Sequence, residues 1–342
     1  MCMKVKDIVL QVLQQALHDE RHVDGYVSGE ELAELCHVSR VSVWKAVKAL
    51  RAKGFAIDAV TNKGYKFMHS DICTKDSILS FMPECHDVSI RFYDSIDSTN
   101  TEAKRLLLQE DKNVLHKTVL VALQQSAGKG RFGRHFYSPA VTGIYFSIIY
   151  IPRHYMHPGF VTAAAAVGLC RSIYSVYGVH CGIKWTNDII HKGKKVAGIL
   201  TEGIASFETG SIDSIIIGCG INIIPNSSLP IDLKDSVGCI CLKNADAKRS
   251  MLCASAIQEI YAILDGDDEY KKEAMKEYKS RSVLIGKQIT VYPLPGGTEK
   301  CCEGTRAYTC RVLDVLDNGV LSVQNENGDV IQLQSGEVSL HG

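Results

Sequence analysis

Apolar positions recur at helical spacing in three segments near the start of the chain. Helices are predicted within residues 4–18, over 28–35 and over 39–50. Two strand-like runs, 55–60 and 65–67, follow around a short polar turn and predict a hairpin. The first helix is predicted from the spacing of Val5, Ile8, Val9, Val12, Leu13 and Ala16. This order of helices and hairpin predicts a winged helix-turn-helix.

The third of these helices has an apolar and a basic face. Val43, Val47 and Leu50 fall on the inner side. Residues 37–67 carry seven bases (Lys53 among them) against the single acid Asp58, a local charge of +6 in a chain of zero formal net charge. Because DNA phosphates attract such an excess, duplex DNA is the predicted partner; the alternative is a helical bundle for protein contacts. The predicted DNA-binding residues are Ser39, Arg40, Ser42, Lys45, Lys48 and Lys63.

Strands and helices are interspersed through the middle of the chain. Strands are predicted over 88–93, 119–123, 143–151, 195–202 and 212–218, with 182–190 as a strand broken by polar groups, and helices over 160–177, 248–264 and 269–281. From Val283 onward, short strands and Asn-Gly turns suggest a small β-barrel of SH3 size. We therefore predict an α+β multidomain fold with domains at 1–68, 69–282 and 283–342.

Composition places the chain among ordinary globular proteins. Apolar residues make up 46% and charged residues 22% of the 342 positions. Neither an apolar run of 18 residues nor a signal-peptide layout occurs, so we predict a cytoplasmic protein without a membrane partner. Thirteen cysteines without a secretory signal indicate reduced thiols, most of them buried. Neither Cys239-x-Cys241 nor Cys301-Cys302 has the spacing of a zinc site.

Glycines and bases are concentrated in Gln125–Arg134, which reads Gln-Ser-Ala-Gly-Lys-Gly-Arg-Phe-Gly-Arg. Glycine lets the backbone approach a ligand closely, and backbone N–H groups beside fixed cations form an anion cradle. Arg131 and Arg134 add planar donors suited to phosphate or carboxylate. No Gly-Lys-Ser/Thr ends the run, which excludes a Walker phosphate loop. The segment predicts an anion site; the alternative is a basic surface turn.

Polar groups also interrupt runs that are too apolar for a surface. Lys184, the pair Asn187-Asp188 and Lys195 need partners, which a ligand with phosphates and Mg²⁺ would supply. Gly218 and Gly220 would allow a ligand to approach a strand closely. The cluster from Asp97 to Glu102 is explained by helix capping when it is taken alone.

Five motifs occur in the order found in biotin protein ligases, and the chain resembles that family over nearly its whole length. The motifs are Ser98-Thr99-Asn100, Gly128–Arg134, Lys184-Trp185-Thr186-Asn187-Asp188, Lys195–Leu200 and Gly218–Asn222. The predicted helix-turn-helix and the ending Ser335–Leu340 resemble the bifunctional class, which is both biotin–[acetyl-CoA-carboxylase] ligase and biotin operon repressor. The resemblance implies a class II synthetase-like central domain.

The resemblance also implies a two-step reaction. Biotin and ATP give biotinyl-5′-adenylate and pyrophosphate, and a lysine of a biotin carboxyl carrier protein then attacks the adenylate. Cations must neutralise the charge that develops at the α-phosphate, so Lys195, Arg131 and Lys184 are the implied catalytic residues. Asp188 is the implied Mg²⁺ ligand. The implied substrate-binding residues are Ser98, Thr99, Asn100, Gln125, Gly128, Lys129, Gly130, Arg131, Gly133, Arg134, Lys195, Gly198, Gly218 and Gly220; those for the nucleotide are Arg131, Arg134, Phe136, Lys184, Asn187 and Asn222.

Three positions depart from the family pattern. Lys129 replaces the first arginine of the glycine-rich loop, which keeps the charge but loses the planar fork. Thr186 replaces a common proline, and Phe136 stands where some members stack a tryptophan on adenine.

Two partners follow from the resemblance and from helix-turn-helix geometry. One recognition helix reads one half-site, so operator binding requires a homodimer, which the adenylate should favour. Strand 195–203 or strand 212–218 could pair edge to edge with the same strand of the second copy. The alternatives are a biotin-sensing repressor with little ligase activity and a lipoate ligase.

Overall fold

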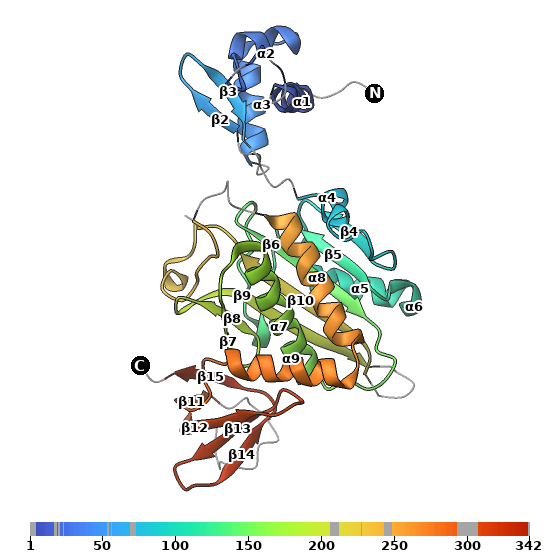
Figure 1. Cartoon of the computed structure of the whole chain (residues 1–342), viewed down its shortest axis with the longest axis vertical. Coiled ribbons are helices and arrows are strands. Elements are labelled where there is room, and N and C mark those ends of the chain that lie inside the picture. Colours follow the sequence, from blue (N-terminus) through green and yellow to red (C-terminus); the bar gives the residue numbers. More distant parts are fainter. Residues whose placement is uncertain are drawn as a thin grey trace.

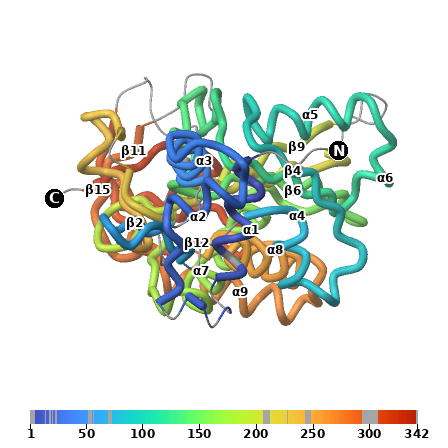
Figure 2. Tube along the Cα trace, turned by 90° about the horizontal axis from the view of Figure 1, so that it is seen from above, coloured from blue at the N-terminus to red at the C-terminus, as the bar shows by residue number. Residues whose placement is uncertain are grey.

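The computed structural model describes residues 5–16, 19, 21–22, 24–52, 55, 57–68, 73–205, 212–226, 228–242, 248–292 and 307–340. In Figure 1 an N-terminal helical unit, a central sheet with its helices and a C-terminal sheet follow one another along the long axis. Viewed from above in Figure 2, α1 to α3 of the N-terminal unit lie over the central part of the chain.

The N-terminal unit has the predicted order of helices and hairpin. Its elements are α1 (Val5–Gln15), β1 (Tyr26–Val27), α2 (Gly29–Leu35), α3 (Arg40–Ala52), β2 (Ile57–Val60) and β3 (Gly64–Phe67). The strands pair in the order β1-β3-β2, so β2 and β3 form the predicted wing. Val43, Val47 and Leu50 are buried in a core of this unit, as their spacing predicts. Lys53 lies outside the described residues.

The central sheet is mixed, because β4 and β5 run parallel and its other pairs antiparallel. Its described strands lie in the order β4-β5-β6-β10-β9-β8-β7. They are β4 (Ser89–Tyr93), β5 (Thr118–Ala122), β6 (Gly143–Tyr150), β7 (Gly182–Lys184), β8 (Asp188–His191), β9 (Lys194–Ala205) and β10 (Ile212–Asn222). Residues 182–190, predicted as a strand broken by polar groups, form two short strands, β7 and β8, that pair antiparallel with each other. Residues 185–187 form the turn between these two strands, and Asn187 of the turn lines the site.

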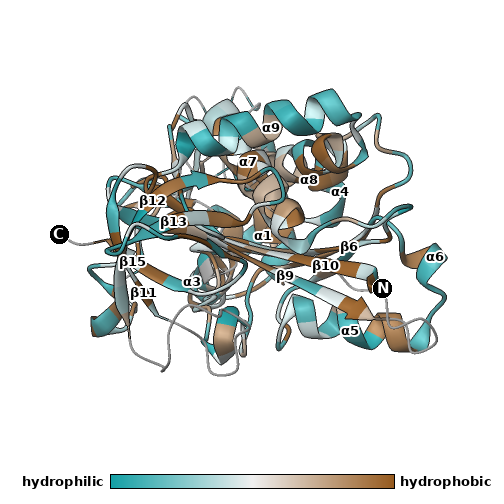
Figure 3. Ribbon diagram, turned by 90° about the horizontal axis from the view of Figure 1, so that it is seen from below, coloured by the Kyte–Doolittle hydropathy of each residue, from teal (hydrophilic) through white to brown (hydrophobic). Residues whose placement is uncertain are grey.

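Helices cover both faces of this sheet. Figure 3 shows α4, α7, α8 and α9 on one side and α5 on the other. Their bounds, with those of the short α6, are α4 (Lys75–Ser80), α5 (Thr99–Gln109), α6 (Lys112–Leu115), α7 (Pro158–Tyr177), α8 (Arg249–Asp265) and α9 (Asp268–Arg281). Helices α7, α8 and α9 agree with the sequence prediction within two residues at each end, whereas α6 and the two-residue strand β1 were not predicted.

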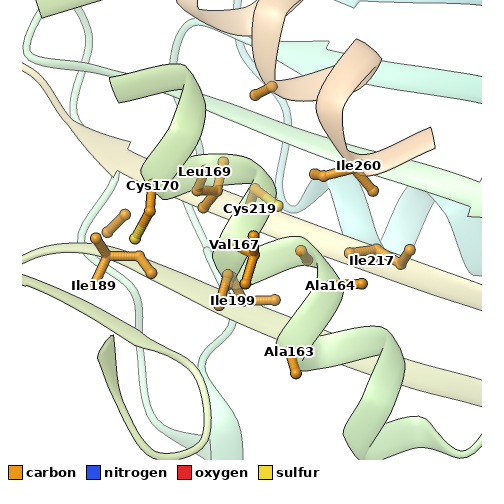
Figure 4. Packing of buried hydrophobic residues seen from close by; sticks show 14 of the residues in the cluster. Ala163, Ala164, Val167, Leu169, Cys170, Ile189, Ile199, Ile217, Cys219 and Ile260 are labelled. Carbon is orange, nitrogen blue, oxygen red and sulfur yellow. The ribbon is translucent and has the colours of Figure 1, made fainter. Parts of the chain in front are cut away.

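Helix α7 forms the centre of the core. Its small residues, such as Ala163 and Ala164, let it lie close to β9, β10 and α8, and Figure 4 shows it facing Ile199, Ile217 and Ile260. The helix has the length and apolar composition of a membrane span, but 67% of its most apolar window is buried inside the protein. It is a core helix of this fold.

The C-terminal strands form an antiparallel sheet in the order β14-β13-β12-β11-β15. They are β11 (Gln288–Tyr292), β12 (Tyr308–Val315), β13 (Leu321–Asn325), β14 (Val330–Leu333) and β15 (Glu337–Leu340). In the described strands β14 and β15 are opposite edges, so this region is all-β without a closed barrel. Its buried residues join the core of the central sheet.

Two other sequence expectations can be compared with these elements. Strand 212–218 cannot offer a free edge over its length, because Ile215–Gly218 of β10 pair with both β6 and β9. Of the ten described cysteines seven are buried, as predicted. Cys301 and Cys302 lie outside the described residues.

Candidate functional site

The alternation of side chains on β10 makes room for a site on the α5 face of the sheet. Ile217 and Cys219 point toward α7 (Figure 4), so Gly218 and Gly220 point the other way. A Cβ atom at Gly218 would overlap Asn100, and one at Gly220 would overlap the Phe136 ring. Glycine at these two positions therefore lets α5 and the glycine-rich loop come against the strand.

The glycine-rich loop folds back on itself above these glycines. The Gly130 N–H donates to the Arg134 carbonyl at 2.7 Å, and the Phe136 N–H donates to the Gly128 carbonyl at 2.9 Å. Gly133 has a φ of 73°, which favours glycine. Gly128 and Gly133 thus shape the loop, while the side chains between them reach the cavities below.

Two adjoining cavities lie beneath the loop. The inner cavity has a volume of about 50 Å³ and the outer cavity about 750 Å³. The inner cavity is lined by Ser98, Thr99, Asn100, Gln125, Lys129, Gly130, Arg131, Phe136, Asn187, Lys195, Gly198, Ile199, Leu200, Gly218, Cys219 and Gly220. Gly130, Arg131, Phe136, Asn187 and Lys195 line both, so they form the boundary between the cavities.

Hydrogen bonds fix the polar wall of the inner cavity. The Thr99 N–H and hydroxyl donate to Gln125 Oε1 at 2.8 and 3.1 Å, and Gln125 Nε2 donates to Ser138. Buried Ser147 lies within hydrogen-bonding distance of Thr99 Oγ1, at 2.7 Å, and of Asn100 Oδ1, at 2.6 Å. Asn100 Nδ2 donates to Glu202 on β9 at 2.9 Å, so Asn100 ties α5 to the sheet as well as lining the cavity.

Helix capping at Ser98 is also present. Its hydroxyl accepts from the Thr101 N–H, and Asp97, the other predicted cap, forms an ion pair with Arg105 at 2.5 Å instead. Capping and cavity lining are therefore compatible roles for this cluster.

Arg131 is a cation held by neutral groups. Its Nη1 donates to Thr186 Oγ1 at 3.0 Å and to Asn187 Oδ1 at 3.3 Å. No described carboxylate lies within ion-pair distance of it, and burial lowers the pKa of its guanidinium from the usual value. A partly buried guanidinium without a charged partner is suited to bind an anion.

Lys195 and Asp188 form an ion pair on the outer side of this boundary. Lys195 Nζ lies 2.6 Å from Asp188 Oδ1 and 5.8 Å from the centre of the Phe136 ring. The position of Lys195 near the start of β9 is fixed by its backbone, whose N–H donates to the Ser236 carbonyl at 2.8 Å.

A turn between β7 and β8 carries Thr186 and Asn187. Asn187 Nδ2 donates to the Ile199 carbonyl at 2.8 Å, and Tyr278 on α9 donates to the Thr186 carbonyl at 3.1 Å. Burial raises the pKa of Tyr278, which keeps its hydroxyl protonated as a donor. Trp185 Nε1 donates to the Gly319 carbonyl of the C-terminal sheet at 2.9 Å. The turn is thus held by α9 and by the C-terminal region.

The glycine-rich loop is also joined to the C-terminal sheet. Arg134 forms two hydrogen bonds with the Glu337 carboxylate, at 2.7 and 2.5 Å. This contact raises the pKa of Arg134 from its usual value. Both residues line the outer cavity.

The sequence reasoning and the structure agree on which residues come together. Every predicted substrate- or nucleotide-binding residue except Gly128 and Gly133 lines one of the two cavities, as does Asp188. The sequence reasoning missed Glu337 and one wall of the outer cavity, which is formed by Ile224, Pro225, Asn226, Leu229, Leu233, Lys234, Ser236, Val237, Gly238 and Cys239. No sequence motif indicates that wall. The apolar residues Ile224, Leu229 and Leu233 are the only feature of the segment that suggests a role in lining a cavity.

The described carboxylate, histidine and cysteine side chains contain no group of three or more that could hold a metal ion. Asp188 is a single carboxylate beside the Asn187 amide. Such a pair suits Mg²⁺ that keeps most of its ligands from water and substrate phosphates.

A second candidate site lies on α3. Arg40, Lys45 and Lys48 are exposed there, as predicted. Ser42 is half-buried and lies 3.0 Å from Ser39, so the two hydroxyls share a hydrogen bond. Lys63, at the tip of the wing, pairs with Asp24 at 2.9 Å.

Comparison with known proteins bears on both sites. Residues 92–222 match the Biotin/lipoate A/B protein ligase family, and residues 11–66 match an HTH domain. The chain is 35% identical to the bifunctional ligase/repressor BirA of Bacillus spizizenii over 323 residues, which cover 92% of this chain and 94% of that protein. It is 29% identical to BirA of Escherichia coli over 82% of each chain. The fold resembles biotin protein ligase from Aquifex aeolicus in complex with biotin and ATP, with a TM-score of 0.59, 24% identity and coverage of 74% of this chain and 98% of that one.

Proposed function

Because this chain belongs to the biotin protein ligase family, in its branch of bifunctional ligase/repressors, we propose that it activates biotin with ATP and attaches it to a protein. The acceptor is a lysine of a biotin carboxyl carrier protein of acetyl-CoA carboxylase. The same chain represses transcription through its N-terminal helix-turn-helix. Biotin and ATP are substrates.

The observation that carries this proposal is Arg131. Its guanidinium lies at the boundary of a narrow inner cavity and a wide outer one, and its hydrogen bonds go to neutral groups. An acyl-adenylate has its anionic phosphate between two bulky neutral ends. Arg131, a cation at the boundary of the two cavities, would therefore lie beside the phosphate of an acyl-adenylate whose two ends occupy the cavities.

The inner cavity is proposed to widen from its present volume of about 50 Å³ when biotin binds in it. Ser98, Thr99 and Gln125 offer hydroxyl and amide groups that can exchange their present bonds for those of a ureido ring. Gly198, Gly218 and Gly220 keep the floor free of side chains. The loop residues Gly128, Lys129, Gly130 and Gly133 let the backbone close over the ligand, and Asn100 positions α5.

The outer cavity is proposed to hold ATP. Phe136 offers a ring face to adenine, and Arg134, Lys184, Asn187 and Asn222 offer polar groups to the ribose and phosphates. Of these, Arg134 has to exchange Glu337 for phosphate.

The proposed reaction has two steps, each of which forms one bond and breaks another. A biotin carboxylate oxygen attacks the α-phosphorus in line, the new P–O bond forms, and the bond to pyrophosphate breaks. Lys195, Arg131 and Lys184 neutralise the charge that develops there. The carrier's lysine amine then attacks the acyl carbon, a C–N bond forms, and AMP leaves with the C–O bond electrons while the amine loses its proton. No nucleophilic side chain of this chain is required, because positioning and charge supply the rate.

Mg²⁺ is proposed to enter with ATP. Asp188 and Asn187 would hold it through one carboxylate and one amide, with phosphates and water completing its shell. The ion would neutralise the leaving pyrophosphate.

Repression is proposed to require a homodimer that the adenylate favours. β8 pairs with β9 only as far as Gly198, so the stretch from Leu200 to Ala205 has one edge without a described partner strand. This edge is the candidate for pairing with a second copy. Sedimentation with biotin and ATP should give tighter dimerisation than without them; equal affinity contradicts the coupling.

The finer architecture and the location in the cell are part of the same proposal. The domain boundaries are 1–68, 69–282 and 283–342, with a class II synthetase-like central domain and an SH3-like C-terminal one. The chain acts in the cytoplasm. Support for an SH3-like domain comes from its five short antiparallel strands.

Labelling of the carrier protein separates this function from its alternatives. The purified chain, ATP and carrier protein are incubated with biotin or with lipoate in parallel. Attachment of biotin alone supports the proposal, whereas preference for lipoate indicates a lipoate ligase. Tight biotin binding without any labelling indicates a sensing repressor.

A further inference from the structure

Helix α3 exposes two large apolar side chains among its basic ones. Val41 is 62% exposed and Trp44 is 53% exposed. Together with Lys45 and Lys48 they follow the spacing i, i+3, i+4, i+7, so the four side chains share one stripe of the helix. Two large apolar side chains that are exposed side by side and rimmed by charge indicate an interaction site.

The charges around this stripe select the kind of partner. Helix α3, Arg-Val-Ser-Val-Trp-Lys-Ala-Val-Lys-Ala-Leu-Arg-Ala, contains no acidic residue. Arg51 turns away toward the hairpin, where its Nε donates to the Ile57 carbonyl at 2.9 Å. Lys48 Nζ stays 5.3 Å from the centre of the Trp44 ring, in a cation–π contact. An apolar protein partner would bury these cations without counter-charge, whereas a polyanion pairs with them.

Duplex DNA combines a polyanion with a specific apolar group. The base edges in the major groove carry one methyl group, at C5 of thymine, and apolar side chains recognise it by contact. We propose that Trp44, with Val41 beside it, contacts thymine C5 methyl groups in the major groove and so fixes where the protein requires thymine. This inference rests on the proposed DNA-binding function of α3.

Replacement of single methyl groups in the DNA tests the contact. The full-length protein with biotin and ATP first selects duplexes from a random pool. The enriched duplex is then remade with deoxyuridine, which lacks only the C5 methyl group, at one thymine at a time. We expect the wild type to bind about 3- to 10-fold more weakly at one or two of these positions.

Variants assign that loss to Trp44. Trp44→Ala is expected to bind the thymine and deoxyuridine duplexes equally. Lys45→Ala, on the same stripe, is expected to weaken binding to both and to keep their ratio, because a phosphate contact does not sense the methyl group. Thermal melting checks that both variants fold. Trp44→Phe, which keeps an aromatic ring, is expected to show an intermediate ratio even if Trp44→Ala fails to fold.

The outcomes separate this inference from the function on which it rests. A wild-type thymine-to-deoxyuridine ratio of one at every position overturns the contact, as does a Trp44 variant that folds and keeps the wild-type ratio. Either result leaves DNA binding intact. Failure to enrich any duplex overturns the DNA-binding function itself, and this inference with it.

Discussion

Lys195 Nζ lies 2.6 Å from Asp188 Oδ1, at the point where β8 meets β9. The pair brings a cation and a carboxylate to the boundary of the two cavities. We expect both to change partners when substrates enter: Lys195 to the biotin carboxylate and the α-phosphate, and Asp188 to Mg²⁺. On the proposed mechanism, Asp188 holds the Lys195 side chain in place and balances its charge until the substrates bind.

Lys195→Ala should fold and make little adenylate. Loss of a charged donor at the site of developing charge lowers rates by roughly 10²- to 10³-fold. Pyrophosphate release in a single turnover measures the step. Lys192→Ala, which changes an exposed lysine three residues away in the β8–β9 turn, is the matched control. Adenylate formation near the wild-type rate by Lys195→Ala would refute the assignment.

Arg131→Gly should release the adenylate that it makes. The side chain provides the guanidinium between the cavities, and its loss also removes the bonds that join the loop to Thr186 and Asn187. We expect escape of the adenylate at least about 10-fold faster, equivalent to about 1.4 kcal/mol, with indiscriminate labelling of nearby lysines. Arg131→Lys, which keeps the charge but loses the planar guanidinium, should release the adenylate at a rate between those of Arg131→Gly and the wild type. Retention as long as in the wild type would contradict the role of the loop as a lid.

The Arg134–Glu337 pair should matter more for ATP binding than for stability. The two side chains are 65% and 40% exposed, and exposed ion pairs contribute about 0.2–1 kcal/mol. Glu337→Gln should therefore shift the melting temperature by only a few degrees. It should lower the KM for ATP several-fold, because Arg134 no longer has to leave the Glu337 carboxylate before it binds phosphate.

A double-mutant cycle with Arg134→Ala measures this coupling directly. Additive effects of the two changes on the KM for ATP would show that Glu337 does not compete with ATP for Arg134.

Stability should fall on acidification in a window set in part by His116. Burial lowers the pKa of this imidazole, and its Nδ1 accepts from the Ile151 N–H at 3.1 Å, which requires that nitrogen to be unprotonated. The unfolded chain therefore binds the proton more readily. His116 does not destabilise the folded chain above a pH of about 6.5, the pKa of histidine in the unfolded chain. Its destabilising effect grows as the pH falls from there toward the lower pKa of His116 in the folded chain.

The contribution of His116 is limited to about 1.4 kcal/mol per pH unit, for one proton. Melting temperatures between pH 8 and pH 5 should fall less steeply for His116→Gln than for the wild type. Parallel curves would mean that His116 does not contribute.

Local patterns made the elements and most of the site predictable from the sequence. The spacing of Val43, Val47 and Leu50 gives the buried face of α3 because a helix repeats every 3.6 residues. Gly218 and Gly220 stand out because a buried strand gains nothing from glycine unless something approaches it closely, here Asn100 and Phe136.

Contacts between distant segments were not predictable in the same way. Glu337 lies 203 residues beyond Arg134, and nothing near either residue indicates the other. Tyr278 reads as one more apolar position of α9, although its hydroxyl holds the Thr186 carbonyl. Strand 212–218 looked like a candidate edge because the apolar pattern of a strand does not say how many neighbours it has.

The most direct test follows one molecule of adenylate through both steps. The protein is incubated with biotin and ATP labelled at the α-phosphate, without a carrier, and passed through a gel-filtration column. We expect about one labelled biotinyl-adenylate to remain bound to each chain. Addition of carrier protein should then release labelled AMP and biotinylate one carrier lysine in equal amounts. No bound label, or release of AMP without biotinylation of the carrier, would contradict the proposed function.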